Sequence, residues 1–188
     1  VDAEVIDDYI VSVTLKNPIA LKDLSDETNF KEFANTYVHE GSNYVLWEIF
    51  EDQQYALYFQ TINNRTLYYN TSGYLNVHWN ESNEIYAFEQ TMLVKIEKLK
   101  KEASTVPPIQ VLQALYSRNL LKPYSHIVDM NLGYSTLVQI TQTQVFTPTW
   151  EVRVQNADGV TEEHFVNAFD GKVLEIQKSL NTLEDEEE

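Results

Sequence analysis

Apolar and polar residues alternate along residues 5–15, near the start of the chain. The residues between the apolar positions are mostly polar, and those positions are Val5, Tyr9, Val11, Val13 and Leu15. Because successive side chains of a strand point to opposite faces, this spacing predicts a β-strand. Asp7 and Asp8 break the alternation, so we expect the strand to be interrupted early.

Helical spacing replaces the alternation over residues 29–39. Phe30, Phe33 and Tyr37 follow one another at intervals of three and four residues. Such spacing gathers apolar side chains on one face of an α-helix. It predicts a short amphipathic helix that ends near Gly41 and covers a sheet with its apolar face.

Residues 43–96 contain five strand-like runs separated by four polar dividers. Each divider supplies side chains that form local hydrogen bonds or tolerate left-handed backbone, as hairpin loops require. The pattern predicts an antiparallel meander. The dividers are Glu51-Asp52-Gln53, Asn63-Asn64-Arg65, Thr71-Ser72-Gly73 and Asn80-Glu81-Ser82-Asn83.

A lysine-rich stretch followed by Ser, Thr and Pro marks a junction between two halves of the chain. Pro107 and Pro108 favour the first turn of a helix, where the missing backbone N–H would have no partner in any case. We expect this helix to end near Asn119. Its apolar face consists of Ile109, Leu112, Leu115 and Tyr116.

Residues 132–146 form a long Thr- and Gln-rich run, which predicts one strand with Tyr134, Val138 and Ile140 on one face. The run continues through Pro148 into the segment with the clearest period of two in the chain. Its apolar face carries Trp150, Val152 and Val154, and its opposite face carries Glu151, Arg153 and Gln155.

The same segment begins a three-stranded meander over residues 147–175. Residues 162–168 form the predicted returning strand and residues 173–177 the third strand. Each turn contains a Gly, which tolerates positive φ. The two turns are Asn156-Ala157-Asp158-Gly159 and Asp170-Gly171.

Together these elements predict an α+β fold, with antiparallel sheets in two related lobes and a short helix packed on each sheet. We expect an N-terminal lobe at residues 1–96, a junction at 97–106 and a C-terminal lobe at 107–180. Residues 181–188 are strongly acidic, which predicts a disordered tail. Each half places a helix ahead of hairpin-linked strands, as a degenerate duplication would, although no fixed period is visible.

The charge balance excludes some classes of partner. Thirteen basic residues stand against 29 acidic ones, and the net charge of −16 opposes broad contact with nucleic acid or an anionic membrane surface. The chain has no Cys, which excludes disulfides, thiolate–zinc sites and cysteine nucleophiles. No run in the sequence approaches the roughly 20 apolar residues of a membrane-spanning helix.

The sequence contains none of the motifs that mark common catalytic sites. GxSxG, HExxH, the P-loop and GxGxxG are all absent. Of the four His residues, only His126 lies near an acid, Asp129, and two ligands do not make a zinc site even on one helix face. We therefore predict a non-enzymatic protein with no catalytic, cofactor-binding or metal-binding residue.

Adjacent acids offer no glycosidase pair either. Asp7 with Asp8, and Glu162 with Glu163, would point to opposite faces of a strand, whereas glycoside hydrolysis needs two carboxyl groups facing one bond. We expect all four to be solvated charges.

An aromatic series over residues 55–79 could stack on sugars or bind a peptide. Sheet packing and cross-strand pairing explain the same side chains without a ligand, and we favour that interpretation. A sheet edge could also accept a partner strand, but the pattern does not identify a free edge. The aromatic residues are Tyr55, Tyr58, Phe59, Tyr68, Tyr69, Tyr74 and Trp79.

Four motifs in the second half resemble the C-terminal half of the YycI family in order and spacing. Gln90-Thr91 and the predicted helix at residues 109–115 are also similar to that family. The likeness extends from about residue 55 to residue 176, and the first forty residues match poorly. The four motifs are Leu132-Gly133-Tyr134, Thr143-Gln144-Val145-Phe146, Pro148-Thr149-Trp150 and Val166-Asn167-Ala168-Phe169-Asp170-Gly171.

The resemblance implies a single-pass membrane-anchored protein whose folded part lies outside the cytoplasm. It implies action with the related YycH on the WalK (YycG) sensor kinase, in the WalR/WalK (YycF/YycG) two-component system that controls cell-wall metabolism in low-GC Gram-positive bacteria. The family is not known as enzymatic and supplies no catalytic positions. Its N-terminal membrane helix is missing from these residues, so we expect an anchor upstream, and a homo-oligomer is compatible with the pattern.

A second likeness leads to a different class of function. One arrangement in the meander also resembles PepSY domains, which occur in protease propeptides and bacterial envelope proteins, and this implies a protease-inhibitory or envelope-binding module. It accounts for the meander but not for the helix and strand before it. Neither likeness identifies the interaction surface, the signal sensed or the sign of regulation. The arrangement consists of Trp150, Gly159, Asn167 and Asp170-Gly171.

Overall fold

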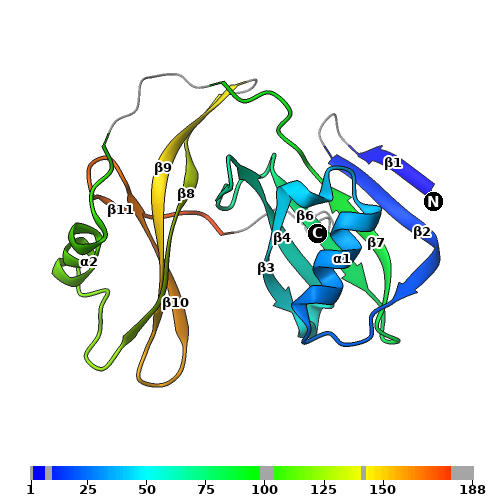
Figure 1. Cartoon of the computed structure of the whole chain (residues 1–188), viewed down its shortest axis with the longest axis horizontal. Coiled ribbons are helices and arrows are strands. Elements are labelled where there is room, and N and C mark those ends of the chain that lie inside the picture. Colours follow the sequence, from blue (N-terminus) through cyan, green and yellow to red (C-terminus); the bar gives the residue numbers. More distant parts are fainter. Residues whose placement is uncertain (1, 7–9, 98–103, 141–142, 179–188) are drawn as a thin grey trace, which may run out of the picture. The chain divides into compact units, whose positions relative to one another are not determined.

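The computed structural model describes residues 2–6, 10–97, 104–140 and 143–178. Within this part of the chain the fold separates into two compact units, the first ending at Ile96 and the second beginning at Glu97 (Figure 1). Both units combine antiparallel strands with one α-helix, so the predicted α+β fold in two lobes is confirmed.

The first unit is built on a sheet with the strand order β1-β2-β7-β6-β4-β3, and β5 pairs with β4 beside this path. All the pairings are antiparallel. The strands are β1 (Asp2–Ile6), β2 (Ile10–Ala20), β3 (Tyr44–Phe50), β4 (Tyr55–Ile62), β5 (Arg65–Thr66), β6 (Tyr74–Trp79) and β7 (Glu84–Gln90).

The polar dividers separate the strands of this sheet as the sequence predicts. The first forms a short 3-10 helix, η2 (Glu51–Gln53), and the others form the turns after β4, before β6 and before β7. Asn63, Asn64 and Asn83 have φ of 51°, 59° and 58°, in the left-handed region that Asn tolerates. The predicted meander is confirmed for β3, β4, β6 and β7, whereas the third of the five predicted runs gives only the short β5 beside β4.

The first predicted strand is wrong in its topology. Residues 5–15 belong to two antiparallel strands, β1 and β2, and Ile6 lies opposite Ile10. The alternation of apolar residues is the same in one strand or two, so periodicity alone cannot detect the reversal. Asp7 and Asp8 lie outside the described residues.

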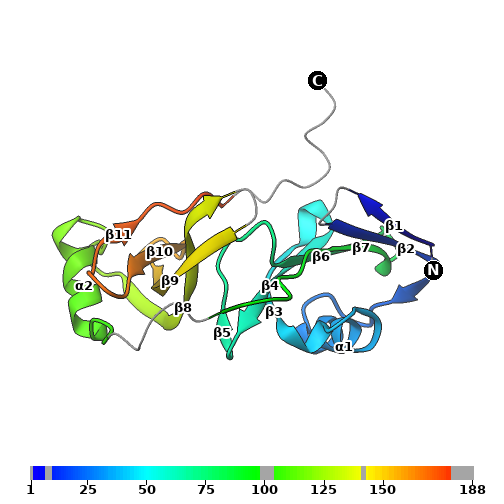
Figure 2. The same cartoon turned by 90° about the horizontal axis from the view of Figure 1, so that it is seen from above.

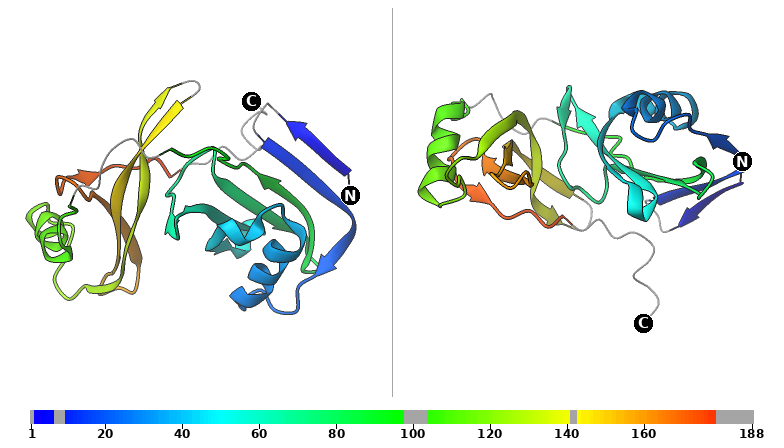
Figure 3. Two further views of the ribbon diagram at one scale, coloured as in Figure 1. Left: turned by 45° about the horizontal axis from the view of Figure 1, so that its top comes forward. Right: turned by 90° about the horizontal axis from the view of Figure 1, so that it is seen from below.

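Helix α1 (Glu27–Tyr37) covers one face of the first sheet (Figures 2 and 3). It begins two residues before the predicted start because the Asp26 carboxylate accepts a hydrogen bond from the Thr28 N–H at 2.9 Å and caps the helix. The Tyr58 hydroxyl donates to the Phe30 carbonyl at 3.0 Å and ties the helix to β4.

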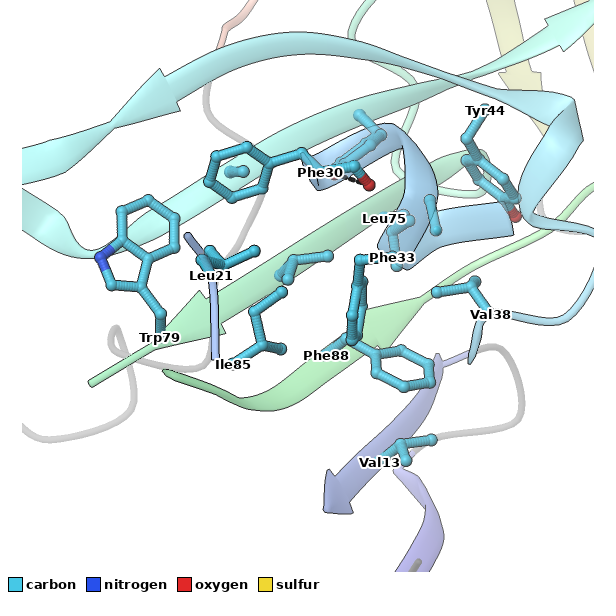
Figure 4. Close-up of a cluster of buried hydrophobic side chains, with 14 residues drawn as sticks. Val13, Leu21, Phe30, Phe33, Val38, Tyr44, Leu75, Trp79, Ile85 and Phe88 are labelled. Carbon is cyan, nitrogen blue, oxygen red and sulfur yellow. Dashed lines mark hydrogen bonds between the residues drawn. The ribbon is translucent and has the colours of Figure 1, made fainter. Parts of the chain in front are cut away.

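The core of the first unit lies between α1 and the sheet (Figure 4). The Phe30 and Trp79 rings lie 5.5 Å apart, and the Phe33 and Phe88 rings meet edge to face at 6.1 Å. Of the predicted aromatic series, Tyr58, Phe59, Tyr68, Tyr74 and Trp79 are almost fully buried. Tyr58 and Trp79 belong to this core, and the other three are buried elsewhere in the unit, so packing within the unit accounts for most of the series.

The second unit is a four-stranded antiparallel sheet with the order β11-β10-β9-β8. Its core joins Val111 and Leu115 of the helix to Val152, Val154 and Val166 of the sheet. The helix therefore packs on its sheet as predicted (Figure 3). The predicted apolar face is wrong at Ile109 and Tyr116, which are 60% and 72% exposed, because the helix turns Val111 into the core beside Leu115. The elements are α2 (Pro108–Ser117), β8 (His126–Ile140), β9 (Thr143–Gln155), β10 (Thr161–Asn167) and β11 (Val173–Leu174).

The prediction of one long strand over residues 132–146 is wrong. This stretch contains the end of β8 and the start of β9, which form an antiparallel hairpin with Ile140 opposite Thr143. The reversal carries none of the Gly, Asn, Asp or Pro residues that signal a turn. The later turns agree with prediction, since Gly159 and Gly171 have φ of 88° and 71°.

Two further expectations concern the acidic tail and membrane-spanning helices. The predicted acidic tail at residues 181–188 lies outside them. No helix within them has the length and apolar character needed to span a membrane.

Candidate functional site

The one predicted His–acid pair lies on a strand rather than a helix. His126 and Asp129 are both exposed on β8. The two oxygens of Asp129 accept hydrogen bonds at 2.8 Å from the Met130 N–H and from Asn131 Nδ2. Within the described ranges, no group of three His, Cys, Asp or Glu residues is placed to hold a metal ion.

Glu162 and Glu163 have separate sets of partners. Glu162 accepts hydrogen bonds from Lys122 Nζ at 2.7 Å and Asn156 Nδ2 at 2.6 Å, and the Lys122 bond is the main cause of its lowered pKa. Glu163 pairs with Lys178 at 3.1 Å and with Arg153 at 3.7 Å. The two acids do not face each other, as predicted, but Glu163 is ion-paired and 13% exposed rather than solvated.

The YycI-like motifs of the second unit build the lobe itself. Trp150 Nε1 donates to the Val106 carbonyl at 3.1 Å, and the Val106 N–H donates to the Ala168 carbonyl at 2.7 Å. The segment before α2 is thereby fixed to the sheet. Asn167 Oδ1 accepts from the Phe169 N–H at 2.8 Å and shapes the following turn.

The face of the second sheet away from α2 is polar and largely buried. The Ser135 and Thr149 hydroxyls lie 2.7 Å apart, and both residues are almost fully enclosed. Glu151 is on this face, as predicted, but is 0% exposed and accepts hydrogen bonds from Arg153 Nε at 2.8 Å and Asn131 Nδ2 at 3.4 Å. Burial raises the pKa of Glu151, and the neighbouring Arg153 partly offsets the rise.

The first sheet also buries polar groups on the face away from α1. Asn76 lies between Leu57 on β4 and Glu89 on β7, directly opposite each of them. Asn76 is 1% exposed, and neither its amide nitrogen nor its amide oxygen has a hydrogen-bond partner. Burial raises the pKa of Glu89, and burial together with the Glu89 charge raises the pKa of Tyr74 to about 12.

His164 is the most enclosed imidazole of the second unit. Its side chain is 11% exposed, and its Nε2 lies 3.6 Å from a Glu162 carboxylate oxygen without forming a hydrogen bond. Burial lowers the pKa of His164, and Glu162 opposes this effect. The imidazole is thus held neutral beside a carboxylate whose stronger partners are Lys122 and Asn156.

Sequence reasoning missed Asn76, Glu89 and the burial of Glu151. The period of two assigns each residue to a face, but it does not report whether that face is enclosed. Burial raises the pKa values of Glu89 and Glu151, as in many general acids. Their enclosure favours a part in packing, since a general acid must reach the substrate it protonates.

Asn76 and Glu151, which are among the most buried of the described polar groups, therefore lie within the sheets of two α+β lobes. This arrangement defines a domain of two antiparallel sheets, each covered by one helix. The YycI family model matches residues 5–169, and the chain belongs to that family. The YycI family is a family of regulators in the WalK pathway and is not an enzyme family.

The family match begins earlier than the sequence motifs suggest. It includes the first forty residues, where we expected a poor match, from residue 5 onward. A structure described as an uncharacterized protein from Eubacterium rectale has a similar fold, with a TM-score of 0.55 and 13% identity over 90% of this chain and 68% of that one. A search of curated proteins found no match.

Proposed function

We propose that this chain is the extracytoplasmic part of a membrane-anchored protein that regulates the WalK (YycG) sensor kinase together with YycH. The observation that carries the proposal is the YycI family match over residues 5–169. Regulation proceeds through protein–protein contacts and affects cell-wall metabolism. The anchor is a helix upstream of Val1.

The surface chemistry supports contact through apolar patches and strand edges. A net charge of −16 repels other acidic surfaces, so long-range attraction contributes little to such an encounter. Exposed apolar side chains are present on both units, including Tyr86 on β7 and Ile109 and Tyr116 on α2. We expect the complex with the kinase to depend weakly on salt.

In-cell crosslinking of the full-length protein tests the proposed partners. We expect covalent adducts with WalK and with YycH, each lost when the partner gene is deleted. A membrane protein of similar abundance and unrelated function serves as the control. Adducts with neither WalK nor YycH would refute the proposal.

The proposed location has its own test, because the chain has no Cys. A single cysteine at Tyr124, whose side chain is 87% exposed, gives one labelling site. In the full-length protein, Tyr124→Cys should react with a membrane-impermeant maleimide in intact cells, and the parent protein supplies the unlabelled control. Labelling only after the cells are opened would place the domain in the cytoplasm.

A further inference from the structure

Glu162 on β10 joins two other segments of the second unit to its own strand. Its Oε1 accepts hydrogen bonds from Lys122 Nζ at 2.7 Å, in the loop between α2 and β8, and from Asn156 Nδ2 at 2.6 Å, at the start of the β9–β10 turn. The loop and the turn lie at the same end of the unit, at the bottom of Figure 1. One carboxylate oxygen therefore fastens both segments to β10.

His164 faces the other oxygen of the same carboxylate. It lies two residues along β10, on the same face as Glu162, and pairs with Val152 of the core. The distance from its Nε2 to Glu162 Oε2 is 3.6 Å, and Nε2 has no hydrogen-bond partner. The side chain is 11% exposed, so a positive charge on the ring would be nearly enclosed and without an acceptor.

The charges around His164 favour a neutral ring at neutral pH. Burial lowers its pKa below the ordinary value of 6.5, and Lys178 and Lys122 add to this effect, whereas Glu162 opposes it. Helix α2 and strand β11 carry no charged residue. The charged residues of β9 and the remaining one of β10 lie on the opposite face of the sheet, and they are Glu151, Arg153 and Glu163.

We propose that His164 is a pH-sensitive switch, whose protonation draws Glu162 away from Lys122 and loosens the loop at residues 118–125. A proton from solvent leaves both ring nitrogens with a hydrogen, so Nε2 becomes a donor aimed at Oε2. Two cations then compete for one carboxylate. The Lys122 ammonium can turn to water because its side chain is 55% exposed, whereas the enclosed imidazolium has Glu162 as its nearby acceptor. The switch does not rest on the proposed kinase contact.

A spin label beside Lys122 reports the state of the loop. Because the chain has no Cys, Tyr124→Cys places one nitroxide two residues from Lys122, at a side chain that is 87% exposed. Electron paramagnetic resonance should show a more mobile label as the pH falls from about 8 to about 5, the range in which histidine titrates. The midpoint should lie below 6.5 and coincide with that of the His164 imidazole in an NMR titration.

Substitutions in the labelled chain assign the response to the switch. His164→Gln should abolish it, and His126→Gln, at an exposed His on β8, is the matched control that should leave it unchanged. Glu162→Gln removes the charge that holds Lys122, so the label should be mobile already at the higher pH and respond little to acid. A full response in His164→Gln or Glu162→Gln would overturn the proposal. So would a label midpoint that differs from that of the His164 ring, or a label that stays immobile while the ring titrates.

Discussion

Asn76 and Glu89 face each other across β6 and β7, and both are buried in the first sheet. A buried amide with no partner costs about 1–3 kcal/mol, and a buried carboxylate is costly unless paired. Burial raises the pKa of Glu89, so the folded state favours the protonated carboxyl. The stabilising contribution of Glu89 is therefore fully present below its ordinary pKa of 4.5 and is lost as the pH rises through the raised value.

Glu89→Gln should stabilise the protein at neutral pH, because Gln keeps the shape of the protonated acid and cannot ionise. We expect a gain of about 1 kcal/mol, which corresponds to roughly 2–4 °C in Tm for a chain of this length. The gain should shrink as the pH falls toward 4. Thermal unfolding at several pH values measures it, with Glu81→Gln in the exposed turn before β7 as the control. A lower Tm for Glu89→Gln at pH 7 would contradict this account.

Asn76→Leu should also raise the free energy of unfolding, by about 1 kcal/mol or more. Leu has nearly the same branched shape as Asn, and it removes two buried polar atoms that have no partner. Chemical denaturation measures the change, and Asn35→Leu on the exposed side of α1 is the control. A clear loss of stability would mean that the Asn76 amide has a partner in solution, such as a bound water.

The sequence predicts the apolar side of each sheet better than the polar side. Val152 and Val154 lie in the core as their alternation indicates, but Glu151, next to Val152 on the opposite face, is equally buried. An acid in a strand is normally interpreted as solvent-facing because an isolated charge is costly to bury. Arg153 and Asn131 reduce that cost for Glu151, and the Asn131 contact comes from another strand, which periodicity cannot reveal.

At the scale of elements, the end of α1 depends on a close backbone approach. Gly41 follows the helix in η1 (Gly41–Asn43), where a Cβ atom would collide with the Ala34 carbonyl group. We predicted that the helix ends near Gly41, and the backbone becomes extended at Val38. The constraint at Gly41 is steric, since this residue lies against the last turn of the helix.

Gly41→Ala should therefore destabilise the first unit by about 2–3 kcal/mol, because the Ala34 backbone must shift. Gly159→Ala is the matched comparison in the second unit. An added Cβ meets nothing there, and only the φ of 88° causes strain, so the cost should be about 1 kcal/mol. Denaturant unfolding of both variants gives the ranking. Equal costs, or a larger one for Gly159→Ala, would refute the steric explanation.

Turn residues mark most of the reversals that the sequence predicts. The Asn-rich divider after β4 and the Gly-containing turns of the β9–β11 meander mark real reversals. The β8–β9 reversal follows a Thr- and Gln-rich run without such residues, so two strands were predicted as one. Strand pairing over a long hairpin can fix a reversal that local sequence does not encode.

At the scale of the whole molecule, charge and family membership suggest the same kind of function. A chain of net charge −16 that belongs to the YycI family is suited to selective protein contacts and poorly suited to nucleic acid. The family could be predicted from motifs in the second lobe because those motifs shape turns and fix α2 to its sheet. The contact surface could not, since exposed apolar residues leave no periodic signal in the sequence.

Co-purification of the full-length protein with WalK and YycH, across a series of salt concentrations, tests the central claim most directly. We predict that both partners are recovered with the protein and that recovery changes little between low and high salt, because the proposed contacts are mainly apolar and strand-edge contacts. Recovery of neither partner at any salt concentration would contradict the account.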